Sequence, residues 1–277
     1  MSAAAFDRSA YLGAPVELFV FSRGNERWTY TNNSRDLLLS GENFSSRWPI
    51  QRQSVEQSPD MSKATLTVDT VNDLPVLVPF KQYPPSNVTT LVIYRVHITD
   101  PDKELETVWT GVIGSVSFAE KQAKISCSPL ILSTKRSLLR RYFQTQCPYI
   151  LYGDGCFVSR TEFQEPATVE SQIGLQLNFQ SLATFPDDYF SGGWAEWQTL
   201  YALERRFIQG HVGNSLILDA PFVGISGGAA VTLYPGCDHS LSGENGCGPK
   251  FNNTDNYGGF PYIPPKNKNP FGGNPIY

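Results

Sequence analysis

The amino-acid sequence predicts a mainly β protein, with a β-barrel or sandwich domain over residues 1–141 and a β-rich domain over residues 142–277. Three observations lead to this fold class. Short strand-like segments recur at roughly 8–12-residue spacing with turn residues between them, as in sandwiches and barrels. The 23 glycines and 20 prolines make up 43 of 277 residues, and Val, Thr, Tyr and Phe are frequent, which favours strands and turns over helices. The sequence shows no internal repeat and no coiled-coil heptad.

The first half begins with a hairpin pattern. Residues 17–21 (ELFVF) and 28–31 (WTYT) are apolar and β-branched, and the turn residues 22–25 separate them. A third strand is expected where residues 64–68 alternate between apolar and polar side chains.

Residues 90–99 form the clearest strand pattern of the chain. At period two, one face carries four apolar side chains: Val92, Tyr94, Val96 and Ile98. Residues 109–118 and 123–129 predict the next hairpin, which turns around residues 120–122.

A basic connector follows over residues 130–145. It holds four positive charges within seven residues, namely Lys135, Arg136, Arg140 and Arg141. Such a segment is usually a solvated connector. The alternatives are a surface for an acidic partner and a counter-charge to a nearby anionic metal centre. We place the boundary between the two domains near Arg141, where this connector meets the first pair of cysteines.

The second half is harder to interpret. Residues 194–211 fit either a helix or a hairpin, because the periodicity does not separate the two. Residues 215–222 and 229–234 are expected to be closing strands. The tail, residues 235–277, contains 22 Gly, Pro or Asn among 43 residues, so it lacks the apolar side chains of an ordinary core. Something other than hydrophobic burial is expected to fix this tail in place.

Composition excludes several classes of protein. The net charge is −4 and the sequence pI about 5.4, so there is no overall attraction to nucleic acid, and no nucleic-acid recognition site is evident. The N-terminal residues lack the long apolar stretch of a signal peptide. A membrane span over residues 220–236 is rejected because Pro221, Gly224, Gly227 and Gly228 interrupt it. We therefore expect synthesis in a reducing cytoplasm, where disulfides are disfavoured.

Signs of catalysis are also missing from the sequence. It contains no GxSxG, HExxH or P-loop motif, and no GxGxxG between a strand and a helix. We expect that the protein is not an enzyme and has no catalytic residues.

Four cysteines carry the main chemical signal. They form two pairs, Cys147 with Cys156 and Cys237 with Cys247, so that the steps between them are 9, 81 and 10 residues. Thiolates are soft ligands, and four of them suit an iron–sulfur cluster or a zinc ion. Neither pair has the short spacing of a zinc knuckle, and ferredoxin runs are absent. The spacing alone does not distinguish an iron–sulfur cluster from a zinc ion.

The neighbours of these cysteines support a metal site. Glycines stand beside three of them, and glycine allows backbone N–H groups to approach sulfur closely. His239 lies two residues after Cys237 and is an alternative ligand. The remaining candidates have structural interpretations: Cys127 is expected to be a buried small apolar residue, and His97 and His211 to be structural histidines.

Several segments together resemble one known family. In the first half these are ELFVFSRGNERWTYT, then Pro49-Ile50 with Arg52, VIYRVHITD and VWTGVIGSV; in the second half they are RRYFQTQCPYILYGDGCFV and GCDHSLSGENGCGPKFNNTDNYGGFPYIPPKNKNPFGG. This combination resembles the baseplate or tail-tip hub proteins of long-tailed, non-contractile phages and of gene transfer agents, including the phage BR0599 type. The C-terminal block is the most specific part of the resemblance.

The resemblance implies a structural virion protein at the tail tip, assembled in the host cytoplasm. It implies a homotrimeric hub ring that closes the distal tail tube, through which DNA passes. The expected partners are the distal tail protein, the receptor-facing tip or fibre protein, and the tape measure protein. It also implies a [4Fe–4S] cluster on Cys147, Cys156, Cys237 and Cys247, with zinc as the less favoured cofactor. The step from Cys237 to Cys247 is longer than in some relatives, so the loop between them is expected to differ.

Two other functions remain open at this point. The same cluster would suit a soluble electron-transfer protein, for which the basic connector would serve as a docking patch. A metal-stapled β-rich module that binds a host surface is the other, with Tyr257, Phe260 and Tyr262 as candidate sugar-contacting aromatics.

Overall fold

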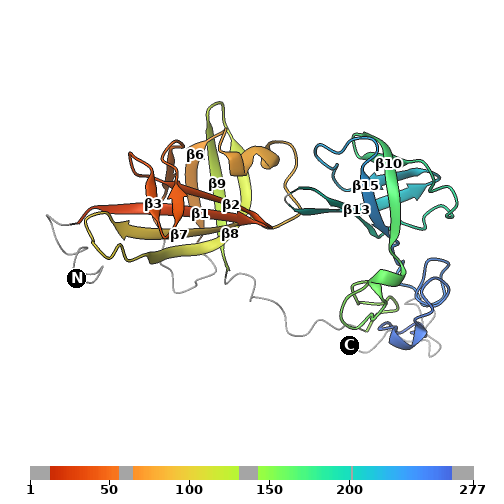
Figure 1. Cartoon of the computed structure of the whole chain (residues 1–277). Helices are drawn as coiled ribbons and strands as arrows, with labels where there is room; N and C mark the ends of the chain where they lie inside the picture. The colour runs from red at the N-terminus through yellow and green to blue at the C-terminus, as the bar shows by residue number, and fades with distance from the viewer. Residues whose placement is uncertain (1–12, 56–64, 131–142, 201, 264–277) are drawn as a thin grey trace. The chain divides into compact units, whose positions relative to one another are not determined.

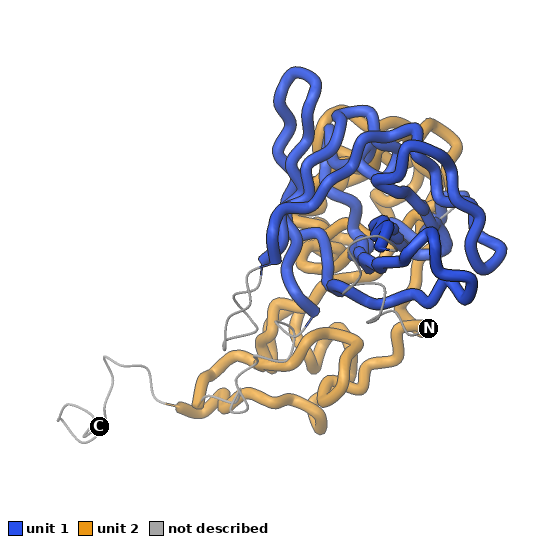
Figure 2. Tube along the Cα trace, turned by 90° about the vertical axis from the view of Figure 1, so that its left-hand side faces the viewer, with its two compact units in different colours: residues 1–136, 198–204 blue, residues 137–197, 205–277 orange. Residues whose placement is uncertain are grey.

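The structure, a computed structural model, describes residues 13–55, 65–130, 143–200 and 202–263. The chain divides into two compact units (Figures 1 and 2). Unit 1 comprises residues 1–136 and 198–204, and unit 2 comprises residues 137–197 and 205–277. The predicted boundary near Arg141 and the basic residues 135–141 lie outside the described residues.

Unit 1 is built on one antiparallel sheet of seven strands, in the order β2-β1-β7-β8-β9-β6-β5. The strands are β1 Pro15–Arg23, β2 Glu26–Thr31, β5 Ile50–Arg52, β6 Leu66–Val71, β7 Thr90–His97, β8 Glu106–Phe118 and β9 Gln122–Pro129. The two hairpins predicted from the sequence are confirmed as β1–β2 and β8–β9. The strand predicted at residues 64–68 corresponds to β6.

The predicted strand at residues 90–99 is β7, and the main core of unit 1 lies on the face opposite to Val92, Tyr94 and Val96. Leu91 and Ile93 are fully buried in the main cluster, together with Phe19, Phe21 and Ile125. The 3-10 helix η2 (Pro75–Lys81) adds Val76 and Leu77 to this cluster.

The other face of β7 is covered as well, by a small hairpin of β3 (Leu37–Leu39) and β4 (Glu42–Phe44). Tyr94 and Val96 pack there against Leu39 and Phe44, whereas Ile98 is exposed. Apolar side chains occupy both faces of β7. The period-two pattern in the sequence therefore identified the face that packs in the smaller of the two apolar clusters.

The sheet of unit 1 is an open half-barrel, so the mainly β fold predicted for residues 1–141 is confirmed, and its described strands form an open sheet instead of a closed barrel or a sandwich. Its edges are β2 and β5, and β5 has only three residues with which to form a ladder. An ion pair of 2.6 Å between Arg52 of β5 and Glu17 of β1 joins the two sides. The closed barrel of this protein lies in unit 2.

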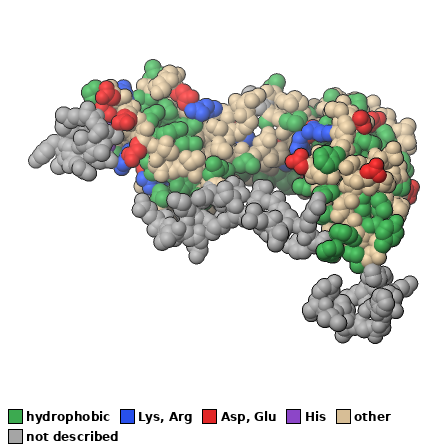
Figure 3. Space-filling view, turned by 90° about the horizontal axis from the view of Figure 1, so that it is seen from below, with side chains coloured by type: hydrophobic (Ala, Val, Ile, Leu, Met, Phe, Trp, Pro, Cys, Tyr) green, Lys and Arg blue, Asp and Glu red, His purple; other side chains and the backbone are tan. Residues whose placement is uncertain are grey.

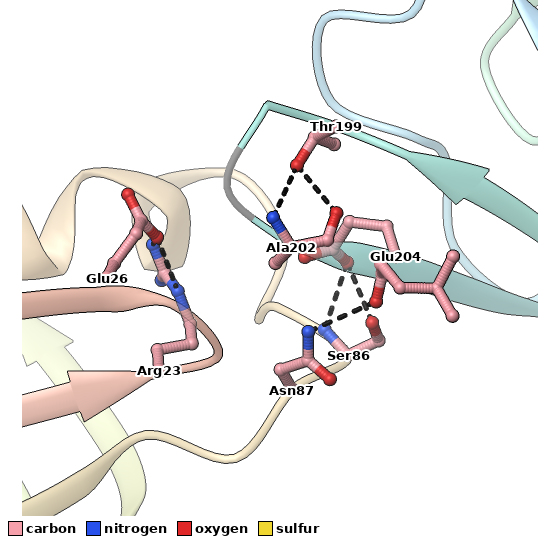
Figure 4. A network of polar contacts seen from close by, with 8 residues as sticks. Arg23, Glu26, Ser86, Asn87, Thr199, Ala202 and Glu204 are labelled. Carbon is pink, nitrogen blue, oxygen red and sulfur yellow. Dashed lines mark hydrogen bonds and ion pairs between the residues drawn. The ribbon is translucent and has the colours of Figure 1, made fainter.

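Residues 198–204 are grouped with unit 1, and hydrogen bonds join Leu203 and Glu204 to residues 86 and 87 (Figure 4). The backbone N–H and the hydroxyl of Ser86 both donate to Oε2 of Glu204, at 3.1 and 2.9 Å. The carboxamide of Asn87 donates to the carbonyl oxygen of Leu203 at 3.1 Å.

Unit 2 contains a closed six-stranded barrel in the order β10-β11-β14-β13-β12-β15. The strands are β10 Glu165–Ile173, β11 Gln176–Phe179, β12 Trp194–Gln198, β13 Leu203–Val212, β14 Ser215–Leu218 and β15 Ala230–Tyr234. The segment 194–211, which fits either a helix or a hairpin, carries the strands β12 and β13, and the two predicted closing strands are β14 and β15. The interior of the barrel is filled by Phe179, Phe190 and Phe222 together with aliphatic side chains.

The barrel brings two distant segments to one place. Its first and last strands pair antiparallel, with Glu165 of β10 opposite Leu233 of β15. The segment before β10 and the segment after β15 therefore meet the barrel at neighbouring positions. Residues 143–163 and 235–263 contain no strand, only the short 3-10 helices η4 (Arg160–Glu162) and η5 (Thr254–Asn256). In the described part of the chain, no helix is long and apolar enough to cross a membrane.

Candidate metal centre

The four cysteines of the two predicted pairs line one cavity of unit 2. Cys147 and Cys156 come from the segment before the barrel, and Cys237 and Cys247 from the segment after it. The other lining residues are Tyr149, Leu151, His239 and Asn256. All four cysteines are free thiols. The cavity measures about 10 Å³, which is room for roughly one water-sized body.

The loop between Cys147 and Cys156 is compact because glycine permits it. The N–H of Cys156 donates to the carbonyl oxygen of Gly153 at 3.1 Å. Gly155 has a φ of +93°, and a Cβ at this position would lie 2.7 Å from the ring of Tyr149. A Cβ on Gly258 would lie 2.4 Å from the same ring. The ring of Tyr149 thus lies between two glycines, one from each cysteine segment.

The loop between Cys237 and Cys247 is held by hydrogen bonds from its own backbone N–H groups. The N–H of His239 points to Sγ of Cys237 at 3.3 Å, with His239 in the left-handed region at a φ of +61°. The N–H of Cys247 donates to the carbonyl oxygen of Ser240 at 2.9 Å. A Cβ on Gly243 or Gly246 would collide with Ser240, so this turn requires glycine at both positions.

Two residues join the loops to each other. His239 accepts a hydrogen bond from the N–H of Cys147 at 2.8 Å through its carbonyl oxygen, and its Nδ1 lies 3.0 Å from the carbonyl oxygen of Cys147. Asn253 donates from its carboxamide to the carbonyl oxygen of Cys156 at 2.6 Å. Its own carbonyl oxygen accepts from Sγ of Cys247 at 3.0 Å. The cysteines are therefore held together by contacts between backbone and side chains around them.

An apolar layer surrounds part of this site. Leu151, Cys156, Val158 and Phe251 form a small buried cluster, and the ring of Phe163 packs on Phe251 with a centroid distance of 4.9 Å. Burial raises the pKa of Cys247 to about 11, and it also raises the pKa of Cys237. As free thiols these two groups are protonated at neutral pH, so a metal would bind there with release of protons.

The donor set fits a soft metal, since four thiols face one space. Among the described residues, however, no group of three or more His, Cys, Asp and Glu side chains is arranged around the position of a single metal ion. Zinc draws four sulfurs to about 2.3 Å from one point. The four thiols are therefore a donor set for a soft metal, either zinc or an iron–sulfur cluster.

The other residues singled out by the sequence lie elsewhere. Cys127 is fully buried in β9 within the core of unit 1, as predicted. His97 and His211 are buried, and Nε2 of His211 lies 3.0 Å from the carbonyl oxygen of Gly213. The aromatic Tyr257 has a structural contact, because its hydroxyl donates to the carbonyl oxygens of Thr145 (2.5 Å) and His239 (3.2 Å).

Sequence reasoning missed the residues around the cysteines, among them Tyr149 and Asn253, and it also missed Lys250, which donates to the carbonyl oxygen of Gly236 before Cys237. Their signal was local and weak. Asn253 lies in an FNN run, Lys250 is the one cation between the second cysteine pair and residue 263, and Tyr149 lies directly after the Cys147-Pro148 pair. Only the fold shows that these residues meet.

Comparison with known proteins gives the family of this chain. The family model described as the N-terminal attachment domain of the baseplate hub protein matches residues 16–159, which is just over half of the 277 residues. The chain belongs to the phage baseplate hub family. A second model, the phage conserved hypothetical protein BR0599, matches residues 188–267 of this hub protein. The two matches include all four site cysteines between them.

Two relatives are more distant. A Xylella fastidiosa (strain 9a5c) protein described as uncharacterized is 25% identical over 169 residues, which cover 56% of the hub protein and 34% of the relative. The hub protein thus spans about a third of the length of that relative. A chain from the virion of a native gene transfer agent particle superposes with a TM-score of 0.77 over 99% of the hub protein and 96% of that chain. Their sequences are 17% identical, so this likeness shows the fold.

Proposed function

We propose that this hub protein is a structural component of the virion at the tip of a long, non-contractile tail. In this role it closes the distal tail tube as a homotrimeric ring. It links the distal tail protein ring to the receptor-facing tip or fibre protein, and it meets the tape measure protein. The match of the attachment-domain model to residues 16–159 is the observation that carries the proposal. The role is structural and requires no catalytic residue.

The surface of the protein supports an assembly role. Large apolar side chains are exposed around the cysteine site, among them Ile150, Phe157 and Tyr262, the last with 91% of its surface accessible. Figure 3 shows hydrophobic side chains on the face that it draws, with few basic ones among them. Exposed apolar surface of this kind is typical of protein–protein contacts.

We further propose that Cys147, Cys156, Cys237 and Cys247 hold a [4Fe–4S] cluster. When bound, the cluster would supply four iron–thiolate bonds between segments that are about 90 residues apart. The segment after β15 has little core of its own, so this bonding would contribute directly to the folding free energy of unit 2. The cluster thereby acts as a staple. Tyr152 contributes at the same place, since its hydroxyl donates to the carbonyl oxygen of Pro235 at 3.0 Å.

The test combines metal analysis with particle assembly. Freshly purified protein is expected to be brown and to contain iron and sulfide; a colourless protein with zinc would overturn the cluster. Cells that make particles with Cys237→Ser in place of the wild type are expected to yield few complete tails. Cys127→Ala is the matched control, because it removes a buried thiol outside the site. Normal tails and normal infectivity with Cys237→Ser would overturn the staple.

Further measurements distinguish a tail hub from a soluble electron carrier. A carrier would be found free in the cell and would cycle reversibly between two oxidation states. A hub is found in purified particles, and antibody labelling places it at the tail tip. Binding of the purified protein to host-surface sugars, with no incorporation into particles, would instead favour the surface-binding module.

A further inference from the structure

Lys250 lies against the second cysteine loop, which runs from Gly236 to Cys247. It follows Cys247 by three residues, and its ammonium nitrogen donates to the carbonyl oxygen of Gly236 at 2.8 Å and to Oδ1 of Asn245 at 3.2 Å. It also donates to the carbonyl oxygen of Tyr189 and lies 4.2 Å from the centroid of that ring. Gly236 precedes Cys237, so the ammonium is held directly against the second cysteine loop.

All of these partners are neutral oxygens. Within the described residues, Lys250 forms no ion pair with a carboxylate, although it is half-buried. Burial lowers the pKa of Lys250 to about 8, and the neighbouring Cys237 and Asp238 oppose that change. A half-buried ammonium that lacks an anionic partner is unfavourable, and in proteins such charges are normally paired.

The other described cations of unit 2 are engaged elsewhere. Arg160 and Arg205 both bind the carboxylate of Glu196. Arg206 donates to the carbonyl oxygen of Pro221. Lys250 is thus the described cation that lies against the cysteine loops and has no carboxylate of its own.

We infer that Lys250 is the counter-charge of the four-cysteine centre: a positioning residue whose ammonium offsets the negative charge of the thiolates and favours the reduced form of the cluster. This inference rests on the proposed cluster. A cluster bound by four thiolates carries net negative charge, and each added electron increases it, so a nearby cation raises the reduction potential. Through Tyr189, the same ammonium connects the second cysteine loop to the barrel.

The test is the reduction potential of intact, cluster-loaded protein. Lys250→Gln keeps a hydrogen-bond donor but removes the charge, and it is expected to lower the ratio of reduced to oxidised cluster about tenfold at the wild-type midpoint, which is about 59 mV for one electron. Lys250→Arg keeps the charge and is expected to restore the potential. Asp238→Asn is the control of opposite sign, since it removes a negative charge beside Cys237 while its Oδ1 can still accept from the N–H of Ser240; it is expected to raise the potential.

Each outcome decides between the two proposals. Wild-type protein without iron and sulfide overturns the cluster itself. Wild-type protein with a cluster whose potential is unchanged by Lys250→Gln overturns the role of Lys250 and leaves the cluster intact. If Lys250→Gln and Lys250→Met both lose the cluster, retention by Lys250→Arg supports a requirement for charge. Loss by Lys250→Arg as well would show that lysine acts through its shape, which overturns the inference.

Discussion

The carboxamide of Asn253 donates a 2.6 Å hydrogen bond to the carbonyl oxygen of Cys156, 97 residues earlier in the chain. The backbone N–H of Asn253 also donates to the carbonyl oxygen of Cys247 at 3.0 Å. One residue therefore contacts a cysteine from each pair. Asn256 fixes the orientation of this side chain by donating to Oδ1 of Asn253 at 2.7 Å.

Replacement of Asn253 should loosen the cysteine site. Asn253→Ala leaves the carbonyl oxygen of Cys156 without its donor, and it is expected to reduce the free energy of unfolding by about 1–3 kcal/mol. Iron content per chain should fall with it. Denaturant unfolding and iron analysis measure the two effects. Asn43→Ala, at an exposed position of β4, is the control and should change stability by less than about 0.5 kcal/mol. Equal effects of the two variants would contradict the proposed contact.

The glycine at position 258 should not tolerate a side chain. A Cβ there would lie 2.4 Å from the ring of Tyr149, and Gly155 blocks the ring from the other segment. Gly258→Ala is therefore expected to destabilise unit 2 by about 1–3 kcal/mol, through displacement of a packed ring. Gly210→Ala is the control, because its nearest neighbour would be Ile217 at 3.8 Å. A thermal unfolding midpoint that is the same for Gly258→Ala and Gly210→Ala would rule out this account.

The two hairpins were predictable from the sequence because the residues that specify each hairpin lie close together in the chain. The strands around residues 22–25 and 120–122 follow from apolar alternation and turn residues alone. Alternation within residues 90–99 identified the face of β7 that the hairpin β3–β4 covers, and the strand sequence alone does not show that the main core lies on the other face. The closed barrel of unit 2 was not predicted, because its closure depends on the pairing of β10 with β15, which are about 60 residues apart.

The sequence predicted the four candidate ligands of the site but not the residues that hold them in place. The affinity of thiolates for soft metals identified four candidate ligands from the sequence alone: Cys147, Cys156, Cys237 and Cys247. Their role as ligands stays a prediction. The residues that hold them together are common types whose partners lie far away in the sequence. Asn253 and Lys250 carry no motif of their own, so their contacts with the two cysteine loops come only from the fold.

Glu196 should be important for attaching the first cysteine segment to the barrel. Its carboxylate is buried and accepts from Arg160, from Nε of Arg205 at 2.7 Å and from Nε1 of Trp194 at 3.2 Å. Both arginines are partly exposed and can turn to solvent, so Glu196→Ala is expected to cost about 2 kcal/mol, less than removal of one partner from a fully buried pair. Denaturant unfolding measures it. Glu170→Ala on the exposed face of β10 should be nearly neutral, and a similar loss there would contradict the prediction.

The stability of the protein should fall above pH 9 in part through Cys127. Burial raises the pKa of this thiol from 9.0 to about 12, so between these values the unfolded chain loses the proton first. The unfolded state then binds fewer protons than the folded state, and the free energy of unfolding decreases by about 1.4 kcal/mol per pH unit. Urea unfolding at pH 8 and pH 10 should show a larger decrease for the wild type than for Cys127→Ala. Tyr30, whose pKa burial raises to about 12, is present in both proteins and cancels in the comparison. Equal decreases would show that ionisation of Cys127 is not linked to unfolding in this range.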